Sequence, residues 1–169
     1  MDQFQTKGTP AIGLFGTTLG FFFGFAAVSL YGPTAIKFKE AMDLSPALIG
    51  LLVAIPSLSG SLLRIPFGAW VDITGGRKPF LILLGLSAIG LGGVTLLLNV
   101  VYPAQMHGLY GLILFLGMLS GCGIATFSVG IGQTSYWYPL KKQGKALGTY
   151  AGLGNLAPGL FSLILPIYL

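Results

Sequence analysis

Residues 46–78 read PALIGLLVAIPSLSGSLLRIPFGAWVDITGGRK, a long apolar run that ends in a short charged loop. Ser45 can cap a helix whose first position is Pro46, and mainly apolar residues follow. An α-helix crosses a membrane with about 20 mainly apolar residues. The stretch therefore predicts a membrane-spanning helix over about residues 46–71, with Arg64 in its middle.

The rest of the chain has the same apolar character. Of its 169 residues, 54% are hydrophobic and 8% are charged, whereas a soluble domain carries about 25% charged residues. Asp, Glu, Lys and Arg are absent from four long stretches, which are residues 8–36, 44–63, 79–140 and 146–169. The third stretch has room for two spans, divided where polar residues cluster near 99–108. We therefore predict an all-α, multi-pass membrane protein with five spans, at about residues 11–31, 46–71, 80–100, 109–136 and 146–169.

The spans are predicted to be helices because their apolar runs are continuous, without the alternation that marks barrel strands. Successive loops then lie on opposite sides of the membrane, and Lys and Arg accumulate on the cytoplasmic side. One side receives Lys7, Arg77, Lys78, Lys141, Lys142 and Lys145, whereas the other receives Lys37 and Lys39 beside two acidic residues. This predicts a protein of the cytoplasmic membrane whose N-terminus lies on the cytoplasmic side. It also accounts for the net charge of +5 without a nucleic-acid partner.

Arg64 needs an explanation because no acidic residue lies within seven positions of it. A charge at the centre of a span costs about 3 kcal/mol. Pro56, Gly60, Arg64, Gly68 and Asp72 recur every four residues, which predicts one stripe with open volume beside the guanidinium, lining a water-filled cavity. We interpret Arg64 as the ligand of an anionic substrate, since its planar fork binds two oxygens at once. A guanidinium that snorkels, or that pairs with Asp72 for structural reasons, is the alternative.

Glycine recurs every four residues in three of the predicted spans, which indicates faces that pack closely against other helices. These positions are Gly16, Gly20 and Gly24; Gly117 and Gly121 with Ala125; and Gly144, Gly148 and Gly152.

The loop GAWVDITGGRK at residues 68–78 resembles the signature that follows the second helix of the major facilitator superfamily, Gly-x-x-x-Asp-Arg-x-Gly-Arg-Arg/Lys. In that family the aspartate and the basic residues form a cytoplasmic latch between helices. The resemblance assigns a gating motif to Gly68, Asp72, Gly76, Arg77 and Lys78. Here Ile73 stands where the first arginine is usual, and one glycine is added before Arg77.

Residues 121–159 resemble the fourth and fifth spans of the nitrate/nitrite porters within that superfamily. The matching features are a glycine-rich start, an aromatic exit at 136–139 and the sequence AGLGN at 151–155. The second span is also similar, and its Arg64 matches the arginine that binds the anion. The other residues assigned to substrate binding are Asn155, Phe127, Phe25, Gly152 and Gly154. By this resemblance the asparagine amide donates to the anion, the phenylalanines enclose it, and the glycines let the fifth span approach.

The resemblance implies a twelve-helix fold of which this chain holds the first five helices. It implies secondary active transport of nitrate or nitrite by alternating access, without a cofactor. The implied partners are a small inorganic anion, the lipid bilayer and helices six to twelve. Because such a fold needs two halves of six helices, we expect no transport from residues 1–169 alone, and activity only where another polypeptide supplies the other helices.

Two other functions stay open at this point. A porter for a small organic carboxylate, such as oxalate or formate, also fits an arginine beside aromatic walls. A non-transporting membrane protein, either an assembly partner or a gene remnant, fits the same composition. An enzyme is not expected, because the predicted spans hold no Asp, Glu or paired His for acid–base catalysis.

Overall fold

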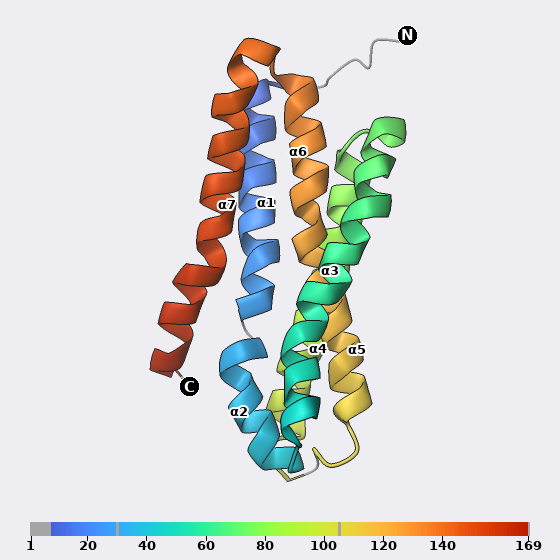
Figure 1. Ribbon diagram of the computed structural model, residues 1–169, viewed down its shortest axis with the longest axis vertical. Helices are drawn as coiled ribbons and strands as arrows, with labels where there is room; N and C mark the ends of the chain where they lie inside the picture. The colour runs from blue at the N-terminus through green and yellow to red at the C-terminus, as the bar shows by residue number, and fades with distance from the viewer. Residues whose placement is uncertain (1–7, 30, 105, 169) are drawn as a thin grey trace.

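The computed structural model describes residues 8–29, 31–104 and 106–168, and these form an elongated bundle of helices (Figure 1). The helices are α1 (Pro10–Ser29), α2 (Tyr31–Met42), α3 (Pro46–Thr74), α4 (Arg77–Val100), α5 (Tyr110–Gly121), the 3₁₀ turn η1 (Cys122–Ala125), α6 (Thr126–Trp137) and α7 (Leu140–Tyr168). No strand occurs within those three described ranges. The prediction of an all-α chain is confirmed.

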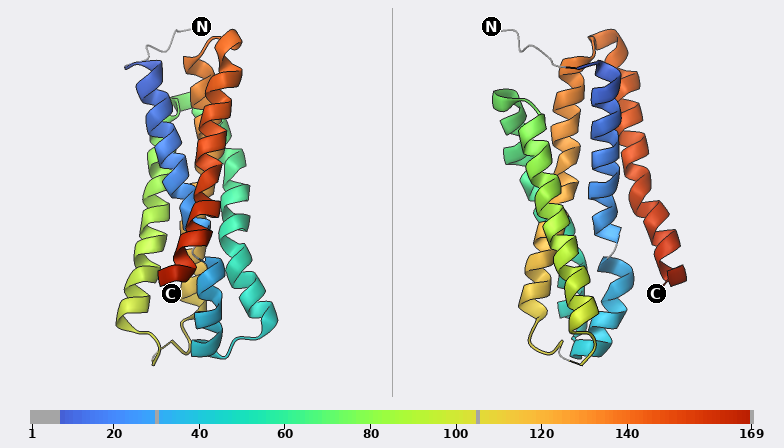
Figure 2. Two further views of the ribbon diagram at one scale, coloured as in Figure 1. Left: turned by 90° about the vertical axis from the view of Figure 1, so that its left-hand side faces the viewer. Right: turned by 180° about the vertical axis from the view of Figure 1, so that it is seen from behind.

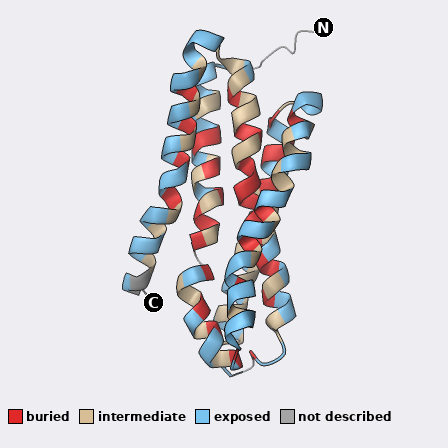
Figure 3. Cartoon of the chain, in the orientation of Figure 1, coloured by how far each residue is buried: buried red, intermediate tan, exposed pale blue. Residues whose placement is uncertain are grey.

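Four helical segments are long and apolar enough to cross a membrane, judged by length and composition: Pro10–Met42, Pro46–Thr74, Arg77–Val100 and Tyr110–Trp137. Their outward faces are largely exposed in the isolated bundle (Figure 3) and carry many large apolar side chains. Ile65 is 76% exposed and Val100 is 79% exposed, which fits a surface that meets lipid. The predicted fifth span, 146–169, coincides with α7 except for Leu169, which lies outside the described residues. α7 is not among the four segments, so its passage through the membrane stays a prediction.

The chain reverses at two opposite ends of the bundle (Figure 1 and Figure 2). One end holds the start of α1 and the α3–α4 and α6–α7 turns, and the other holds the α2–α3 and α4–α5 connections. Arg77 and Lys78 open α4, and Lys141 and Lys142 lie in the first turn of α7, so these four predicted cytoplasmic cations share one end. Lys7, assigned to the same group, lies outside the described residues.

Helix α2 was not expected, because Lys37, Lys39 and Glu40 resemble a loop after the first span. In the structure these charged residues belong to an amphipathic helix. Its buried residues lie three or four positions apart and therefore share one face: Tyr31, Ala35, Phe38 and Met42. Helical structure thus reaches Met42, well past the predicted end of the first span near residue 31, and a count of charges alone cannot reveal that.

The predicted cap of α3 is present, since the Ser45 side chain accepts a long hydrogen bond of 3.5 Å from the Leu48 N–H. At the other end Gly75 has a φ of 75°, a left-handed conformation that glycine adopts without strain. Its N–H donates to the Val71 carbonyl at 2.9 Å. The extra glycine of the loop therefore ends α3 and lets α4 begin two residues later.

The fourth predicted span, about 109–136, lies at the centre of the bundle and is not one continuous α-helix. The turn η1 separates α5 from α6, and all of its residues are buried. A Cβ atom added to Gly123 would overlap the backbone of Gly24 in α1, and one added to Gly121 would overlap the Pro56 carbonyl in α3. Glycine therefore brings three backbones into direct contact, as predicted for Gly24 and Gly121.

Hydroxyl groups from neighbouring helices supply hydrogen bonds beside this interruption. Ser59 of α3 donates to the Met118 carbonyl at 3.0 Å, and Ser87 of α4 donates to the Ser120 carbonyl at 2.8 Å. Backbone carbonyls in an apolar environment need such partners, so the two serines stabilise the junction between α5 and η1.

Other predicted glycine contacts are not made within the described chain. Gly16 in α1 and Gly144, Gly148 and Gly152 in α7 have no atom of another helix within 4 Å of an added Cβ. The buried positions of α7 lie elsewhere on the helix: Ala146, Tyr150, Gly154 and Ala157. Spacing by four predicts that these glycines share a face, but not which face of α7 packs.

Candidate functional site: an arginine beside an aromatic cluster

Arg64 lies near the middle of α3 and is partly buried against α6. Its Cζ atom lies 5.1 Å from the centre of the Phe127 ring, within range of a cation–π interaction. Within the described residues, the Arg64 Nε atom is buried and has no hydrogen-bond partner. The guanidinium therefore contacts a ring rather than a carboxylate and keeps unused donor capacity.

The predicted alternative, a structural pair between Arg64 and Asp72, finds no support in the hydrogen bonds of the bundle. Asp72 is exposed, and its Oδ1 accepts a hydrogen bond of 2.9 Å from the Tyr136 hydroxyl. In the described chain the Asp72 carboxylate thus bonds to Tyr136 at the end of the bundle and not to the arginine.

Four aromatic side chains from three helices form a cluster beside Arg64, which we call the aromatic cluster: Phe21 and Phe25 of α1, Phe127 of α6 and Tyr150 of α7. The Phe21 ring centre lies 5.3 Å from those of Phe25, Phe127 and Tyr150. The Phe127 and Tyr150 rings stack at 6.3 Å with an angle of 21° between their planes. Such spacings are favourable for aromatic pairs, so the cluster fixes one wall beside the guanidinium.

Two of the predicted site residues, Phe25 and Phe127, belong to this cluster. Gly154 supports it, because an added Cβ atom would overlap the Phe21 ring. Gly154 thus lets α7 approach α1 closely, whereas nothing within the described chain lies within 4 Å of a Cβ added at Gly152.

Asn155 does not join the cluster through any hydrogen bond in the described structure. It is exposed, and its Nδ2 atom donates to the Ala151 carbonyl of its own helix at 2.7 Å. Gly152 is three positions away and shares this exposed face. The binding roles of Asn155, Gly152 and the other predicted ligands stay predictions.

The stripe through Arg64 also differs from the expectation of open volume on both sides. A Cβ added to Gly60 would overlap the Gly121 carbonyl, so this glycine serves helix contact. One added to Gly68 would lie 3.6 Å from the Ser128 side chain, which is ordinary contact. The helix turns this stripe gradually outward, from buried Pro56 to exposed Asp72.

Tyr150 is the residue of the site that sequence reasoning missed. Its hydroxyl donates to the Thr126 carbonyl at 2.8 Å and lies 3.3 Å from the Phe127 carbonyl. These partners lie more than 20 positions earlier in the chain, so no local pattern predicts the contact. Its place just before the AGLGN sequence was the only available signal.

A family model described as the Major Facilitator Superfamily matches residues 17–169. The chain belongs to the major facilitator superfamily. It is similar to the nitrate/nitrite transporter NarU of Salmonella typhimurium, with 33% identity over 147 residues, which are 85% of this chain and 30% of that protein. It is also similar to the probable nitrate transporter NarT of Staphylococcus aureus strain JH9, with 30% identity over 164 residues, 97% of this chain and 39% of that protein. The chain therefore spans well under half the length of these relatives.

Membership of the superfamily confirms the predicted family and the reading of the chain as part of a multi-pass membrane transporter fold. Both relatives are named as transporters, which supports the prediction that the chain is not an enzyme. The described residues contain no group of three or more His, Cys, Asp or Glu side chains that could hold a metal ion.

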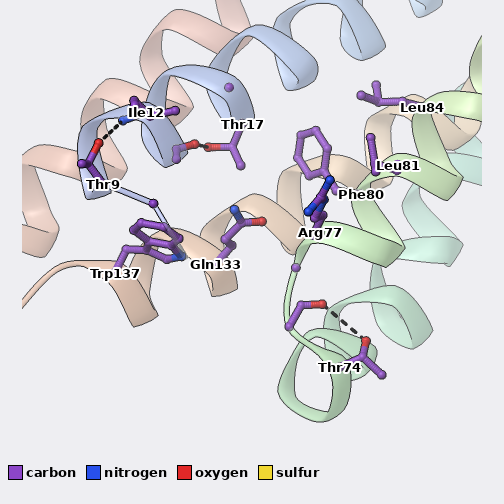
Figure 4. A pocket seen from close by; sticks show the side chains of 15 residues that line it. Thr9, Ile12, Thr17, Thr74, Arg77, Phe80, Leu81, Leu84, Gln133 and Trp137 are labelled. Carbon is purple, nitrogen blue, oxygen red and sulfur yellow. Dashed lines mark hydrogen bonds between the residues drawn. The ribbon is translucent and has the colours of Figure 1, made fainter. Parts of the chain in front are cut away.

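The superfamily signature loop lies at the end of the bundle that carries the cations. Gly76 and Arg77 help to line a cavity of 680 Å³ between α1, α4 and α6, together with Gln133 and Trp137 (Figure 4). Arg64 is not among the residues that line this cavity. The aromatic cluster likewise contributes no residue to the lining of this cavity, and Lys78, next to Arg77 in the chain, is exposed.

Proposed function

We propose that this chain forms part of a secondary active transporter for nitrate or nitrite, and that Arg64 binds the anion. The observation that carries the proposal is the Arg64 guanidinium: its Cζ lies 5.1 Å from the Phe127 ring centre, and its buried Nε has no hydrogen-bond partner among the described residues. A cation in an apolar bundle is costly, and an anion that accepts its hydrogen bonds offsets this cost.

The donor groups of the site favour a small anion with two accepting oxygens. A guanidinium presents parallel N–H donors that match two oxygens of nitrate, nitrite or a carboxylate. The ring of Phe127 then bounds the space beside the bound anion, and Phe25 supports that wall through Phe21. The names of the two relatives favour nitrate or nitrite among the anions that the fork accepts.

Transport follows from alternating access, in which this bundle and a second bundle rock around the anion. The exposed face of α7 with Gly152 and Asn155 meets the second bundle, and the asparagine amide approaches the anion from there. Helices six to twelve complete the site, so residues 1–169 alone are expected not to transport.

The N-terminus is cytoplasmic and the protein lies in the cytoplasmic membrane. This proposal rests on the basic residues that open α4 and α7 at one end of the bundle. The gating motif Gly68, Asp72, Gly76, Arg77 and Lys78 then lies on the cytoplasmic side, where Asp72 is held by Tyr136.

Uptake of labelled nitrate by cells that express the complete transporter tests the proposal. Arg64→Lys keeps the charge and removes the fork, so it should lower uptake at least tenfold at equal expression. Phe127→Leu should raise KM, whereas the matched change Phe115→Leu, at a side chain that is 55% exposed, should leave it unchanged. Full uptake by the Arg64→Lys variant would contradict the assignment.

A small organic carboxylate is the second candidate, because the same fork binds a carboxylate. Competition with nitrate, nitrite, formate and oxalate distinguishes the two. Stronger competition by oxalate than by nitrate would reassign the substrate and leave the role of Arg64 intact. Absence of any anion uptake from the complete protein would favour the non-transporting alternative.

A further inference from the structure

We infer that Tyr150 is a positioning residue for the anion site: its hydroxyl fixes the start of α6 so that the Phe127 ring lies beside Arg64. The inference rests on the proposed function of Arg64 and adds a residue whose described hydrogen bonds go to the α6 backbone and not to the guanidinium.

The Tyr150 side chain is fully buried and crosses from α7 to α6. Its hydroxyl donates to the Thr126 carbonyl at 2.8 Å and lies 3.3 Å from the Phe127 carbonyl. A carbonyl oxygen has two lone pairs, so it can accept this bond in addition to one within its own helix. The contact thus ties α7 to the residue that carries the ring and to the residue before it.

Space for this contact is made by Gly130. A Cβ atom added there would overlap the Tyr150 hydroxyl and ring. The tyrosine therefore reaches the α6 backbone only because position 130 has no side chain. This arrangement makes the hydroxyl contact a specific feature of the packing between α6 and α7.

The segment that Tyr150 holds follows the interruption of the fourth span. The 3₁₀ turn η1 ends at Ala125, and the Thr126 hydroxyl donates back to the Gly123 carbonyl at 2.6 Å. Two hydroxyl bonds, one local and one from α7, therefore fix the first residues of α6. A helix start fixed in this way sets the direction in which the next side chain, Phe127, leaves the backbone.

Ring contacts link the position of the α6 backbone to the arginine. Phe127 stacks on Tyr150 at 6.3 Å and lies 5.1 Å from the Arg64 Cζ. Without the hydroxyl the ring of a phenylalanine at position 150 still fills the space, but the start of α6 is no longer tied to it. Phe127 then samples more positions beside the guanidinium, and the anion is bound less well.

The test compares Tyr150→Phe with Tyr110→Phe in the complete transporter. The Tyr110 hydroxyl also donates to a backbone carbonyl at 2.8 Å, that of Leu48, but it lies at the start of α5. Both variants lose one hydroxyl and one bond of equal length. We expect Tyr150→Phe to raise KM for nitrate about two- to tenfold with kcat within twofold, and Tyr110→Phe to change neither. Equal KM values for the two variants would overturn the inference.

A double-mutant cycle tests whether Tyr150 acts through the Phe127 ring. In a Phe127→Leu background, removal of the Tyr150 hydroxyl should raise KM by less than twofold. If KM rises as much in that background as it does in the wild type, Tyr150 acts by another route, and the inference is overturned. Fluorescence-detected size exclusion of each variant checks that folding is unchanged, and Gly130→Ala, which displaces the hydroxyl, should reproduce the KM effect.

The same assay separates this inference from the proposed function. If Arg64→Lys transports like the wild type, the function assigned to Arg64 fails. If Arg64→Lys loses uptake while Tyr150→Phe keeps the wild-type KM, only the positioning role of Tyr150 fails.

Discussion

The two faces of α7 are both rich in small residues, but only one of them packs against other helices of the described chain. On the packed face, Gly154 lets the backbone approach the Phe21 ring, and Tyr150 reaches across to α6. On the opposite face, Gly148 and Gly152 have no atom of another helix within 4 Å of an added Cβ, and Asn155 bonds only to its own helix among the described contacts. One short sequence, AGLGN, is therefore divided between a face that packs on other helices and a face that makes no contact with another helix at Gly148 or Gly152 within the described chain.

The largest change in stability is expected to distinguish Gly154 from Gly152, the two glycines of AGLGN. Gly154→Ala places a methyl group into the Phe21 ring, so it should destabilise the bundle by about 1–3 kcal/mol and lower the yield of folded protein. The control is Gly152→Ala, two residues away, which meets no atom in the described chain. Thermal unfolding in detergent measures both, and equal midpoints would contradict the division of α7 into two faces.

Asn155→Ala should affect function without affecting the stability of the bundle. The amide makes one bond to the Ala151 carbonyl in its own helix, so its loss should change unfolding by less than about 0.5 kcal/mol. In the complete transporter we expect nitrate uptake to fall about tenfold, because the proposed amide donor to the anion is removed. A loss of stability with normal uptake per folded molecule would show that Asn155 belongs to the packed face instead.

The smallest expected effect is a gain in stability rather than a loss. Gly148 lies within a helix with open space beside it, so Gly148→Ala should stabilise the isolated bundle by about 0.5–1 kcal/mol through helix propensity. The same variant should reduce transport if a second bundle packs closely on this face. A stabilised protein with undiminished uptake would mean that no helix approaches at position 148.

Much of the fold follows from the sequence, because continuous apolar runs and the few charges determine where helices cross and where they turn. The cap at Ser45 and the turn at Gly75 are local and follow from residue type. α2 was missed because its apolar face is narrow and three charged residues, Lys37, Lys39 and Glu40, lie beside it. The interruption at η1 was missed because it arises from contact with two other helices, at Gly24 and Pro56.

The candidate site was predictable only in part, because some of its contacts join residues that are distant in the chain. Arg64 is conspicuous in the sequence because a charge in a span is costly, and a family resemblance selected Phe25 and Phe127. The hydroxyl contact of Tyr150 joins residues that are distant in the chain, and it depends on the absence of a side chain at Gly130. Only the packed structure brings these residues together.

The backbone contacts at Gly24, Gly121 and Gly123 also determine how this bundle can move. Where two backbones touch without side chains between them, no rotamer change can alter their separation. The helices α1, α3 and η1 should therefore move as one rigid body through a transport cycle. Spin labels on the exposed faces of α1 and α3 should report one narrow distance distribution, and that distribution should be the same with and without the anion.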